Sequence, residues 1–440
     1  MSAHLEYLRR YPSLYSSANN HRIVELAGLV VGGSYFAEID GARARGEDAL
    51  ADLVVELDRQ VLPDGASAEL SPAYGAFVLE VGLVVLSFLK RSGRTAPQPL
   101  IDATGRLADW IGVLATDSFT LPALSDDDEA VAVDLGQGDG SRRTASRLRS
   151  AAALLASPRQ RVPVGVDELT LWLAGPDAVR QLSLAPAVLP ASAVFPCAGL
   201  AVLRSRSAGV GEMRVVLDAG PFGLGPLFAH AHADLLSVCL AVDGVEVIVD
   251  PGPLTYFGDS DVRRLAQSTR SHSTVAIDDR DQAQPSGRFM WLDHPDATLT
   301  GFSHDGDTVS AAGVHSAYHP VVHHRTVALS GADVVVRDRI VGLEPNQAAR
   351  LTWQLAPGTA TVVSDRLVVW TGDRRRVHLH VSGARIETTA PLGEPLETTG
   401  LVTMSLGSWK PAPRVVAVAT SDGQERIIET RISAEIMRAR

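Results

Sequence analysis

The segment from residue 228 to residue 282 concentrates side chains that could bind a metal ion or transfer a proton. Its reactive groups are three imidazoles, a carboxylate and a phenol, carried by His230, His232, His272, Asp250 and Tyr256. Neutral imidazole and carboxylate are zinc ligands, and three of them with one open position form a frequent zinc arrangement. The alternative is that these histidines are ordinary polar residues at the edge of a sheet.

Two apolar runs on either side of the Asp-Gly pair at 243–244 predict a β-hairpin, because Asp-Gly suits the positive φ angles of a two-residue turn. A regular hairpin about this turn would place Asp250 opposite Ser237, about 16 Å along the strand from His232. One ion cannot bridge that distance. A metal site therefore requires residues 229–234 to leave the ladder and fold back over the strand end.

A second group of polar residues lies in the N-terminal half. Ser17-Ala-Asn-Asn-His21 opens one predicted helix, and Glu69-Leu-Ser-Pro-Ala-Tyr74 opens another. Asn20, His21 and Tyr74 therefore fall in or near first helical turns, where free N–H groups and the positive end of the helix dipole favour an anion. The alternatives are a capping role for Asn20 and a packing role for Tyr74.

Together these motifs resemble the heparinase II/III-like polysaccharide lyases in both order and spacing. The C-terminal half carries H-x-H-x-D-L-L-S, V-D-P-G, Y-x-G-D, Q-S-T-R-x-H-x-T-V and D-x-R-D-Q, and the N-terminal half carries Asn-Asn-His followed by Ser-x-x-Tyr. The resemblance covers the chain from about residue 190 onward and much of the N-terminal half. It departs at Gly75, where many relatives carry a histidine after the tyrosine.

The resemblance implies a zinc ion held by His232, Asp250 and His272, with a structural role. It also implies that His230 faces the substrate. Tyr256 and Arg270 become candidates for substrate binding, as do the neighbouring arginines 263 and 264.

The activity that the resemblance implies is β-elimination at a uronic acid of an acidic polysaccharide or oligosaccharide, such as a glycosaminoglycan or alginate, which leaves a 4,5-unsaturated uronate. Asn20, with His21, would stabilise the charge that builds on the uronate carboxylate as C5 loses its proton. Tyr74 would protonate the leaving oxygen and could also act as the base. His21 or His230 would be the base for the opposite C5 epimer.

Two other classes of function remain open. One is a non-catalytic sugar-binding or scaffold protein of the same family. The other is a zinc-dependent hydrolase or other metalloenzyme, in which the His/Asp/His site performs the chemistry. The second alternative leaves Asn20, His21 and Tyr74 without a role.

Composition limits the class of protein. The 440 residues are 45% hydrophobic and 21% charged, with a net charge of −11, which argues against a general nucleic-acid binder. No run of about 18 apolar residues predicts a transmembrane helix. The N-terminus lacks the apolar core of a signal peptide, so we expect a cytoplasmic protein, or a periplasmic or secreted one if the natural N-terminus is longer. The oligomeric state stays open.

The predicted fold class is α+β, with an incomplete α/α toroid over residues 1–185 and an antiparallel β-sandwich over residues 190–440. Pro186, Pro190 and Pro196 mark the expected boundary. Helical periodicity predicts helices over 23–33, 49–61, 71–89, 100–115, 142–156 and 166–183. The helix containing residues 76–89 is apolar on nearly every face, which predicts burial on all sides. The acidic run Asp126–Glu129 is expected to be a solvated loop.

Overall fold

A computed structural model of the chain divides into two compact units. The helical unit comprises residues 1–115 and 130–190, and the β unit comprises residues 116–129 and 191–440. The acidic run at 126–129 therefore belongs to the β unit. The structure describes residues 1–136, 138, 140–155, 165–182, 189–387, 393, 394, 396 and 400–437.

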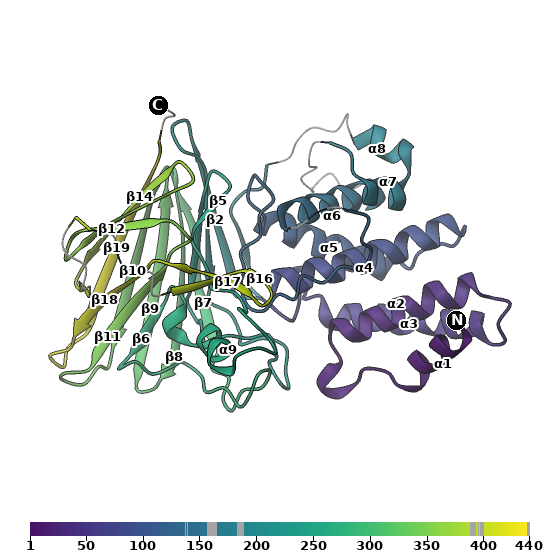
Figure 1. Ribbon diagram of the computed structural model, residues 1–440, viewed down its shortest axis with the longest axis horizontal. Helices are drawn as coiled ribbons and strands as arrows, with labels where there is room; N and C mark the ends of the chain where they lie inside the picture. The colour runs from purple at the N-terminus through teal and green to yellow at the C-terminus, as the bar shows by residue number, and fades with distance from the viewer. Residues whose placement is uncertain are drawn as a thin grey trace. The chain divides into compact units, whose positions relative to one another are not determined.

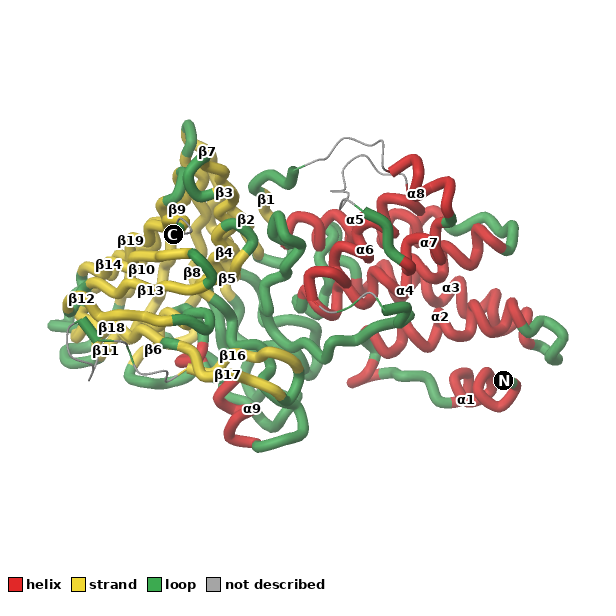
Figure 2. Tube along the Cα trace, turned by 45° about the horizontal axis from the view of Figure 1, so that its top comes forward, coloured by secondary structure: helices red, strands yellow, loops and turns green. Residues whose placement is uncertain are grey.

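The helical unit contains the predicted helices, with one of them divided. In both Figure 1 and Figure 2, α2 and α3 run side by side. The segment predicted as one helix over 166–183 is two helices, because Gly175 has a φ of 86° and Pro176 follows it. The predicted helix ends at 156 and 183, and the predicted boundary residue Pro186, lie outside the described residues. The helices are α1 (Ser2–Arg10), the 3-10 turn η1 (Tyr15–Ser17), α2 (Asn20–Tyr35), α3 (Ala42–Gln60), α4 (Pro72–Arg91), α5 (Gln98–Leu114), α6 (Gly140–Leu155), α7 (Glu168–Ala174) and α8 (Pro176–Leu182).

Helix α4 lies in the core of the helical unit. Ser71 caps it by accepting a hydrogen bond from the Tyr74 N–H, and Pro72 occupies its first turn, as predicted. By length and composition α4 could span a membrane, but 78% of its apolar window is buried inside the protein. Such burial is typical of a core helix, so the predicted burial on all sides is confirmed.

The glycine after Tyr74 has a packing reason. A Cβ atom built on Gly75 would lie 2.4 Å from the Trp110 ring and 3.2 Å from the Ser67 side chain. Trp110 is fully buried in α5. The indole therefore fills the space that a side chain at position 75 would need.

The β unit consists of antiparallel sheets. Within the described residues they are ordered β1-β2-β3-β4-β5, β12-β13-β14-β19-β10-β9-β8-β7, β15-β18-β11-β6 and β16-β17. The unit also contains helix α9 (Ser260–Gln267) and the 3-10 turn η2 (Thr269–Ser271). The strands are β1 (Ala193–Phe195), β2 (Leu200–Ser207), β3 (Gly211–Asp218), β4 (Val238–Val242), β5 (Val245–Ile248), β6 (Val275–Ile277), β7 (Ala297–Asp305), β8 (Thr308–Tyr318), β9 (Val321–Ser330), β10 (Asp333–Val341), β11 (Ala348–Gln354), β12 (Thr359–Ser364), β13 (Leu367–Gly372), β14 (Arg375–Ser382), β15 (Arg385–Glu387), β16 (Gly400–Ser405), β17 (Ser408–Ala412), β18 (Arg414–Thr420) and β19 (Arg426–Ile436).

One hydrophobic cluster joins the larger sheets. Strands β9 and β10 alternate buried with more exposed residues, and every residue of β4 is buried. Inward side chains of the five-, eight- and four-stranded sheets contribute to the same cluster, which includes Val215, Val327 and Trp353. A helical N-terminal region followed by antiparallel sheets around a common core confirms the predicted fold class.

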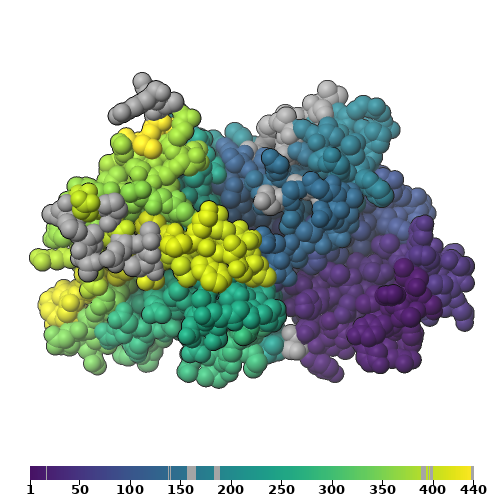
Figure 3. All heavy atoms as spheres, viewed as in Figure 1, coloured from purple at the N-terminus to yellow at the C-terminus, as the bar shows by residue number. Residues whose placement is uncertain are grey.

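The β16-β17 ribbon covers the chain just after β5. The Thr403 hydroxyl donates to the Pro251 carbonyl and accepts from the Leu254 N–H, at 2.8 and 2.9 Å. Figure 3 shows this ribbon in yellow on the surface of the β unit. The ribbon thereby braces the turn that follows Asp250.

We expect Gly75→Ala to lower the free energy of unfolding by about 1–3 kcal/mol, because the new methyl group overpacks the site against Trp110. Gly105→Ala is the matched control. A Cβ at Gly105, also inside a helix, meets no atom within 4 Å, so this change should stabilise by about 0.5–1 kcal/mol. Urea unfolding of both variants measures the difference, and equal stabilities would contradict the packing explanation.

Candidate metal centre and catalytic residues

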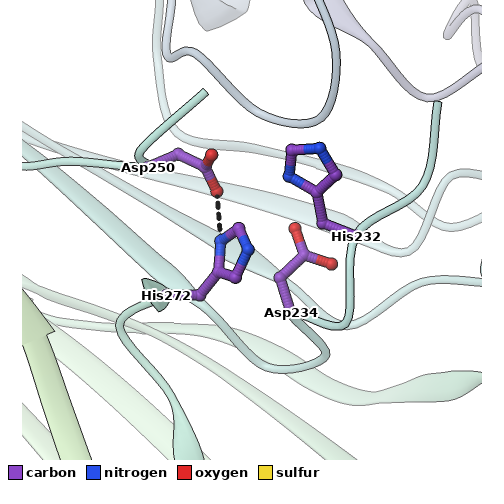
Figure 4. A group of neighbouring side chains, drawn as sticks. All are labelled: His232, Asp234, Asp250 and His272. Atoms are coloured by element: carbon purple, nitrogen blue, oxygen red, sulfur yellow. Dashed lines mark hydrogen bonds and ion pairs between the residues drawn. The ribbon is translucent and has the colours of Figure 1, made fainter. Parts of the chain in front are cut away.

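Four buried side chains converge at the open end of the β4-β5 hairpin. One ligand atom from each of His232, Asp234, Asp250 and His272 lies within 4.8 Å of the others. Figure 4 shows the four side chains pointing toward one another, with Asp250 hydrogen-bonded to His272. These residues form a cluster that could hold a metal ion. It contains the three predicted ligands and adds Asp234.

The chain reaches this arrangement by the route that the metal hypothesis required. Strand β4 begins only at Val238, so residues 229–234 lie outside the ladder. Asp250 lies two residues after the end of β5, and His272 directly follows η2. The folding back of 229–234 is what removes the separation of about 16 Å expected in a regular hairpin.

His232 and His272 each use Nε2 for a hydrogen bond to a group outside the cluster, so the Nδ1 atom of each ring is the one available to an ion. His232 Nε2 lies 3.0 Å from a carboxylate oxygen of Asp126, and His272 Nε2 donates to the Ala266 carbonyl at 2.9 Å. Metal-ligating histidines usually donate their outer N–H to a carboxylate or a main-chain carbonyl. Among the described residues, His232 Nδ1 and Asp234 Oδ2 have no hydrogen-bond partner. The donor set therefore fits a metal ion.

The charge of the site also favours a cation. Burial and the nearby Asp250 carboxylate raise the pKa of Asp218 to about 7, and burial raises the pKa of Asp234 well above its ordinary range. Although burial opposes it, the charge and hydrogen bond of Asp250 raise the pKa of His272 to about 9. Without a metal, His272 is thus an imidazolium paired with the Asp250 carboxylate, and a bound divalent ion would take the place of the protons on His272 and Asp234.

Asp234 is the ligand candidate that sequence reasoning missed. It stands in the H-x-H-x-D motif, two residues after His232. In an extended chain residues two apart share a face, so the spacing that relates His230 to His232 also reaches Asp234. The spacing of the motif is therefore a sequence signal for the fourth candidate ligand.

Main-chain contacts fix the loop that carries His232 and Asp234. The Ala233 N–H donates to the Gln267 carbonyl at 3.0 Å. The Gln282 side chain accepts from the Leu235 N–H at 2.7 Å and donates to its carbonyl at 3.1 Å, and the Thr274 hydroxyl donates to that carbonyl at 2.7 Å. Gln282, which ends the D-x-R-D-Q motif, therefore holds in place the loop that carries His232 and Asp234.

A buried arginine joins the two chain segments around the cluster. Arg325 donates to the carbonyls of Leu236 and Ser273, both at 2.6 Å, and pairs with the Asp338 carboxylate at 2.7 and 3.1 Å. These carbonyls lie two residues after Asp234 and one residue after His272. Arg325 therefore ties together the loops that present two candidate ligands.

Behind Arg325 runs a chain of neutral histidines. The Ala317 N–H donates to His315 Nδ1, so His315 Nε2 carries a proton and faces His323 Nδ1 at 3.2 Å. His323 Nε2 then donates to Asp338 at 2.7 Å. Burial lowers the pKa of His323, and burial with the neighbouring charges lowers that of His315 well below its ordinary value. Both histidines are therefore neutral in the folded protein.

The acidic run proved to be more than a solvated loop. Asp128 and Glu129 are exposed, but Asp126 is fully buried, so the expectation was wrong for this residue. Arg263 pairs with both oxygens of the Asp126 carboxylate, at 2.6 and 2.7 Å. Although burial opposes ionisation, the Arg263 charge holds the pKa of Asp126 well below its usual range. Local sequence offers no signal that separates Asp126 from its solvated neighbours.

The remaining candidates of the β unit lie in different environments. His230 is partly exposed, and its Nδ1 lies 3.4 Å from Asp126. Tyr256 is buried, with the Arg263 guanidinium 5.3 Å from its ring centroid, whereas the adjacent Phe257 is 78% exposed. Arg263, once a candidate for sugar contact, is buried by its pairing with Asp126. Arg270 is exposed on η2.

In the helical unit, the two predicted motifs are joined by a hydrogen-bonded pair. The Asn20 amide donates to both oxygens of Glu69, at 3.0 and 3.1 Å, and both side chains are buried. Asn19, not Asn20, caps α2 by accepting from the His21 N–H. The capping alternative for Asn20 is therefore wrong. Glu69 opens the segment that leads into Tyr74, and nothing in the local sequence indicates that it pairs with Asn20.

His21 and Tyr74 both occupy first turns, as predicted. His21 is exposed at the start of α2. Tyr74 is 4% exposed, and its backbone N–H is held by the Ser71 cap of α4. The predicted positions of these residues on their helices are thus confirmed, whereas their roles stay predictions.

Comparison with solved structures identifies the fold. A heparinase III structure matches with a TM-score of 0.76 at 18% identity, covering 99% of this chain and 62% of that protein. The heparan sulfate lyase of Pedobacter heparinus matches with a TM-score of 0.73 at 18% identity, covering 99% of this chain and 62% of that one. The chain thus shares the fold of proteins that combine a helical N-terminal domain with antiparallel C-terminal sheets.

The chain also matches a known protein family in both of its halves. The family described as Heparinase II/III-like, C-terminal, matches residues 187–425, and the Heparinase II/III N-terminus matches residues 1–135. The chain belongs to the heparinase II/III-like family. A heparin-sulfate lyase of Bacteroides stercoris is 22% identical over 352 residues, or 78% of this chain. The chain spans 47% of the length of that relative.

We expect His232→Ala to lose bound metal and to lower the melting temperature more than His230→Ala does, because removing a ligand also removes binding energy coupled to folding. Asp234→Ala should resemble His232→Ala if its carboxylate is a ligand. Elemental analysis of protein purified without chelator, followed by thermal unfolding, measures both effects. Absence of metal from the wild type would contradict the prediction.

We expect His315 and His323 to contribute stability that is lost as the pH drops from about 7 to 5, because they stay neutral when folded but titrate near 6.5 when unfolded. At these two residues the unfolded chain then binds more protons, which favours unfolding. The raised pKa values of Asp218 and His272 act in the opposite direction, so the test compares variants instead of the total slope. His315→Gln should reduce the pH slope of unfolding free energy by up to about 1.4 kcal/mol per pH unit. The exposed His304 supplies the control His304→Gln, which should keep the wild-type slope in urea unfolding. Equal slopes in all three proteins would refute the prediction.

Proposed function

We propose that this chain is a polysaccharide lyase that cleaves a uronic-acid-containing polysaccharide or oligosaccharide by β-elimination and leaves a 4,5-unsaturated uronate. The observation that carries the proposal is the pairing of Asn20 with Glu69, which links the helix start bearing Asn20 and His21 to the segment leading into Tyr74. The names of the relatives, a heparin-sulfate lyase and a heparan sulfate lyase, support the substrate class.

Asn20 stabilises the negative charge that develops on the uronate carboxylate. The proton on C5 of a uronate is weakly acidic, so its removal requires hydrogen bonds to the carboxylate on which negative charge develops. An amide nitrogen carries two hydrogens, and both contacts to Glu69 involve a single carboxylate. Glu69 thereby orients the amide at the N-terminus of α2, where the helix dipole adds a favourable field. His21, exposed beside it, would assist.

Proton transfer is assigned to the phenol and the imidazoles. Tyr74 protonates the glycosidic oxygen that leaves C4, and it can also serve as the base when both atoms lie on one face of the sugar. His230 or His21 removes the C5 proton in the opposite epimer, because imidazole is the side chain most often used for general acid–base catalysis. Tyr256 and Arg270 are assigned to substrate binding.

Zinc is the proposed occupant of the metal cluster. The cluster offers two imidazoles and two carboxylates. This mixed set suits Zn²⁺, whereas Ca²⁺ and Mg²⁺ prefer ligand sets made only of oxygen. His232, Asp234, Asp250 and His272 would hold it. A closed set of four protein ligands is typical of structural zinc, which would rigidify the loop bearing His230 and activate no water.

The decisive assay uses a panel of acidic polysaccharides, including heparan sulfate, chondroitin sulfate, hyaluronan and alginate. Elimination creates a conjugated unsaturated uronate, which absorbs in the near ultraviolet. Absorbance with any member supports the lyase class. Hydrolysis without absorbance would favour a metal-dependent hydrolase, and binding without cleavage would favour a sugar-binding protein.

We expect Tyr74→Phe to reduce kcat by about 10² to 10⁴, because the general acid is lost while the ring and its packing remain. Asn20→Ala should reduce kcat/KM through lost charge stabilisation, by about 3–4 kcal/mol in transition-state free energy by analogy with an oxyanion donor. A substrate with a good leaving group at C4 should partly rescue Tyr74→Phe but not Asn20→Ala.

The rate of unsaturated-uronate formation measures both variants, and metal content and melting temperature serve as controls for folding. If Tyr74→Phe keeps near-normal activity, Tyr74 is a packing residue and the assignment of the acid fails.

A further inference from the structure

The buried carboxylate of Asp126 contacts two histidines that stand two residues apart. Its Oδ1 lies 3.0 Å from His232 Nε2, and its Oδ2 lies 3.4 Å from His230 Nδ1. Arg263 donates one N–H to each of the same oxygens. The carboxylate therefore meets a different ring nitrogen on each histidine.

An ionised carboxylate can only accept hydrogen bonds. Each imidazole nitrogen that faces Asp126 must therefore carry the proton of its ring. For neutral rings, this places the proton of His232 on Nε2 and leaves the lone pair on Nδ1, which faces the metal cluster. The same rule places the proton of His230 on Nδ1 and leaves the lone pair on Nε2.

We propose that Asp126, clamped by Arg263, is a positioning residue that imposes opposite tautomers on His230 and His232. One carboxylate thereby prepares Nδ1 of His232 as a metal ligand and Nε2 of His230 as the atom that accepts the substrate proton. The catalytic part of this inference rests on the proposed lyase function of His230. The logic is that of a serine protease triad, in which an aspartate fixes the tautomer and orientation of the histidine base.

A purely structural ion pair explains the geometry less completely. A metal-ligating histidine needs only a main-chain carbonyl behind it, as His272 has in Ala266. His232 instead uses a buried carboxylate, which supplies a second oxygen that reaches His230. The second oxygen is what a carbonyl could not provide. The side chain of His230 is 12% exposed and its Nε2 atom is buried, so a substrate reaches that nitrogen only by displacing the atoms that cover it.

The first test reads the tautomers directly and needs no activity. Full-length protein labelled with ¹⁵N-histidine and loaded with zinc chloride is compared by NMR with Asp126→Asn, with signals assigned through His230→Gln and His232→Gln. The wild type should show Nδ1–H for His230 and Nε2–H for His232. Asp126→Asn should change the His230 tautomer or mix its two forms, whereas Asp128→Asn, an exposed carboxylate of the same acidic run, should change neither.

The second test separates positioning from folding. Asp126→Asn should weaken zinc binding by about 10- to 100-fold, the usual effect of losing a hydrogen-bond partner of a ligand. Saturating zinc chloride should restore metal content and melting temperature but leave kcat low, with little change in KM. The double variant Asp126→Asn/His230→Ala should have the same kcat as His230→Ala, because positioning acts only through His230.

Asp126→Asn leaves the buried Arg263 without its counter-charge, so a second variant guards against misfolding. Asp126→Asn/Arg263→Gln removes both charges together and is expected to show the same tautomer change. Wild-type tautomers in both variants, or additive losses of kcat, would overturn the inference. Predicted tautomers in a wild type that eliminates no uronate would retain the positioning role and reject the lyase function.

Discussion

The β unit is organised around a buried excess of negative charge. Asp218, Asp234 and Asp250 lie near the imidazole of His272, and all of these groups except the partly exposed Asp218 are buried. Buried carboxylates are tolerated only when paired, protonated or bound to a metal. Here the raised pKa values of Asp218 and His272 show that protons supply the compensation when no cation is present. A divalent ion would replace those protons and convert an unfavourable cluster into a rigid centre.

The surrounding structure serves to hold this cluster in place. The chain before β4 lies outside the sheet and is held by hydrogen bonds from its backbone to the Gln267 carbonyl and the Gln282 side chain, while Arg325 bridges the carbonyls on either side of the site. Leu236, within this loop, has a φ of 61°, a conformation that is rare for a bulky residue. Such a conformation persists only where neighbouring contacts determine it. The loop is therefore specified by its partners more than by its own preferences.

Asp126 contacts both the candidate metal ligand His232 and the proposed base His230, so one buried carboxylate supports both side chains. A change at either histidine should be felt by the other through the shared carboxylate, because a hydrogen-bonded network of this kind does not divide into independent pairs. Glu69 has a comparable relation to Asn20 in the helical unit. In both units, a buried carboxylate orients the polar group proposed to act on the substrate.

Local pattern determined much of this protein. The Asp-Gly turn at 243–244, the Ser71-Pro72 start of α4 and three candidate metal ligands, His232, Asp250 and His272, could be read from short motifs, because turns, caps and motif spacings are short-range properties. The fourth candidate, Asp234, was not predicted. The partners of the site could not be read in this way. Asp126 lies 106 positions before His232, and Glu69 lies 49 positions after Asn20. No periodicity or propensity separates Asp126 from the solvated acidic residues after it, or Gly75 from a glycine with open space around it. Only folding brings Arg263 to Asp126 and Trp110 to Gly75, since burial and charge pairing depend on contacts between residues far apart in the chain.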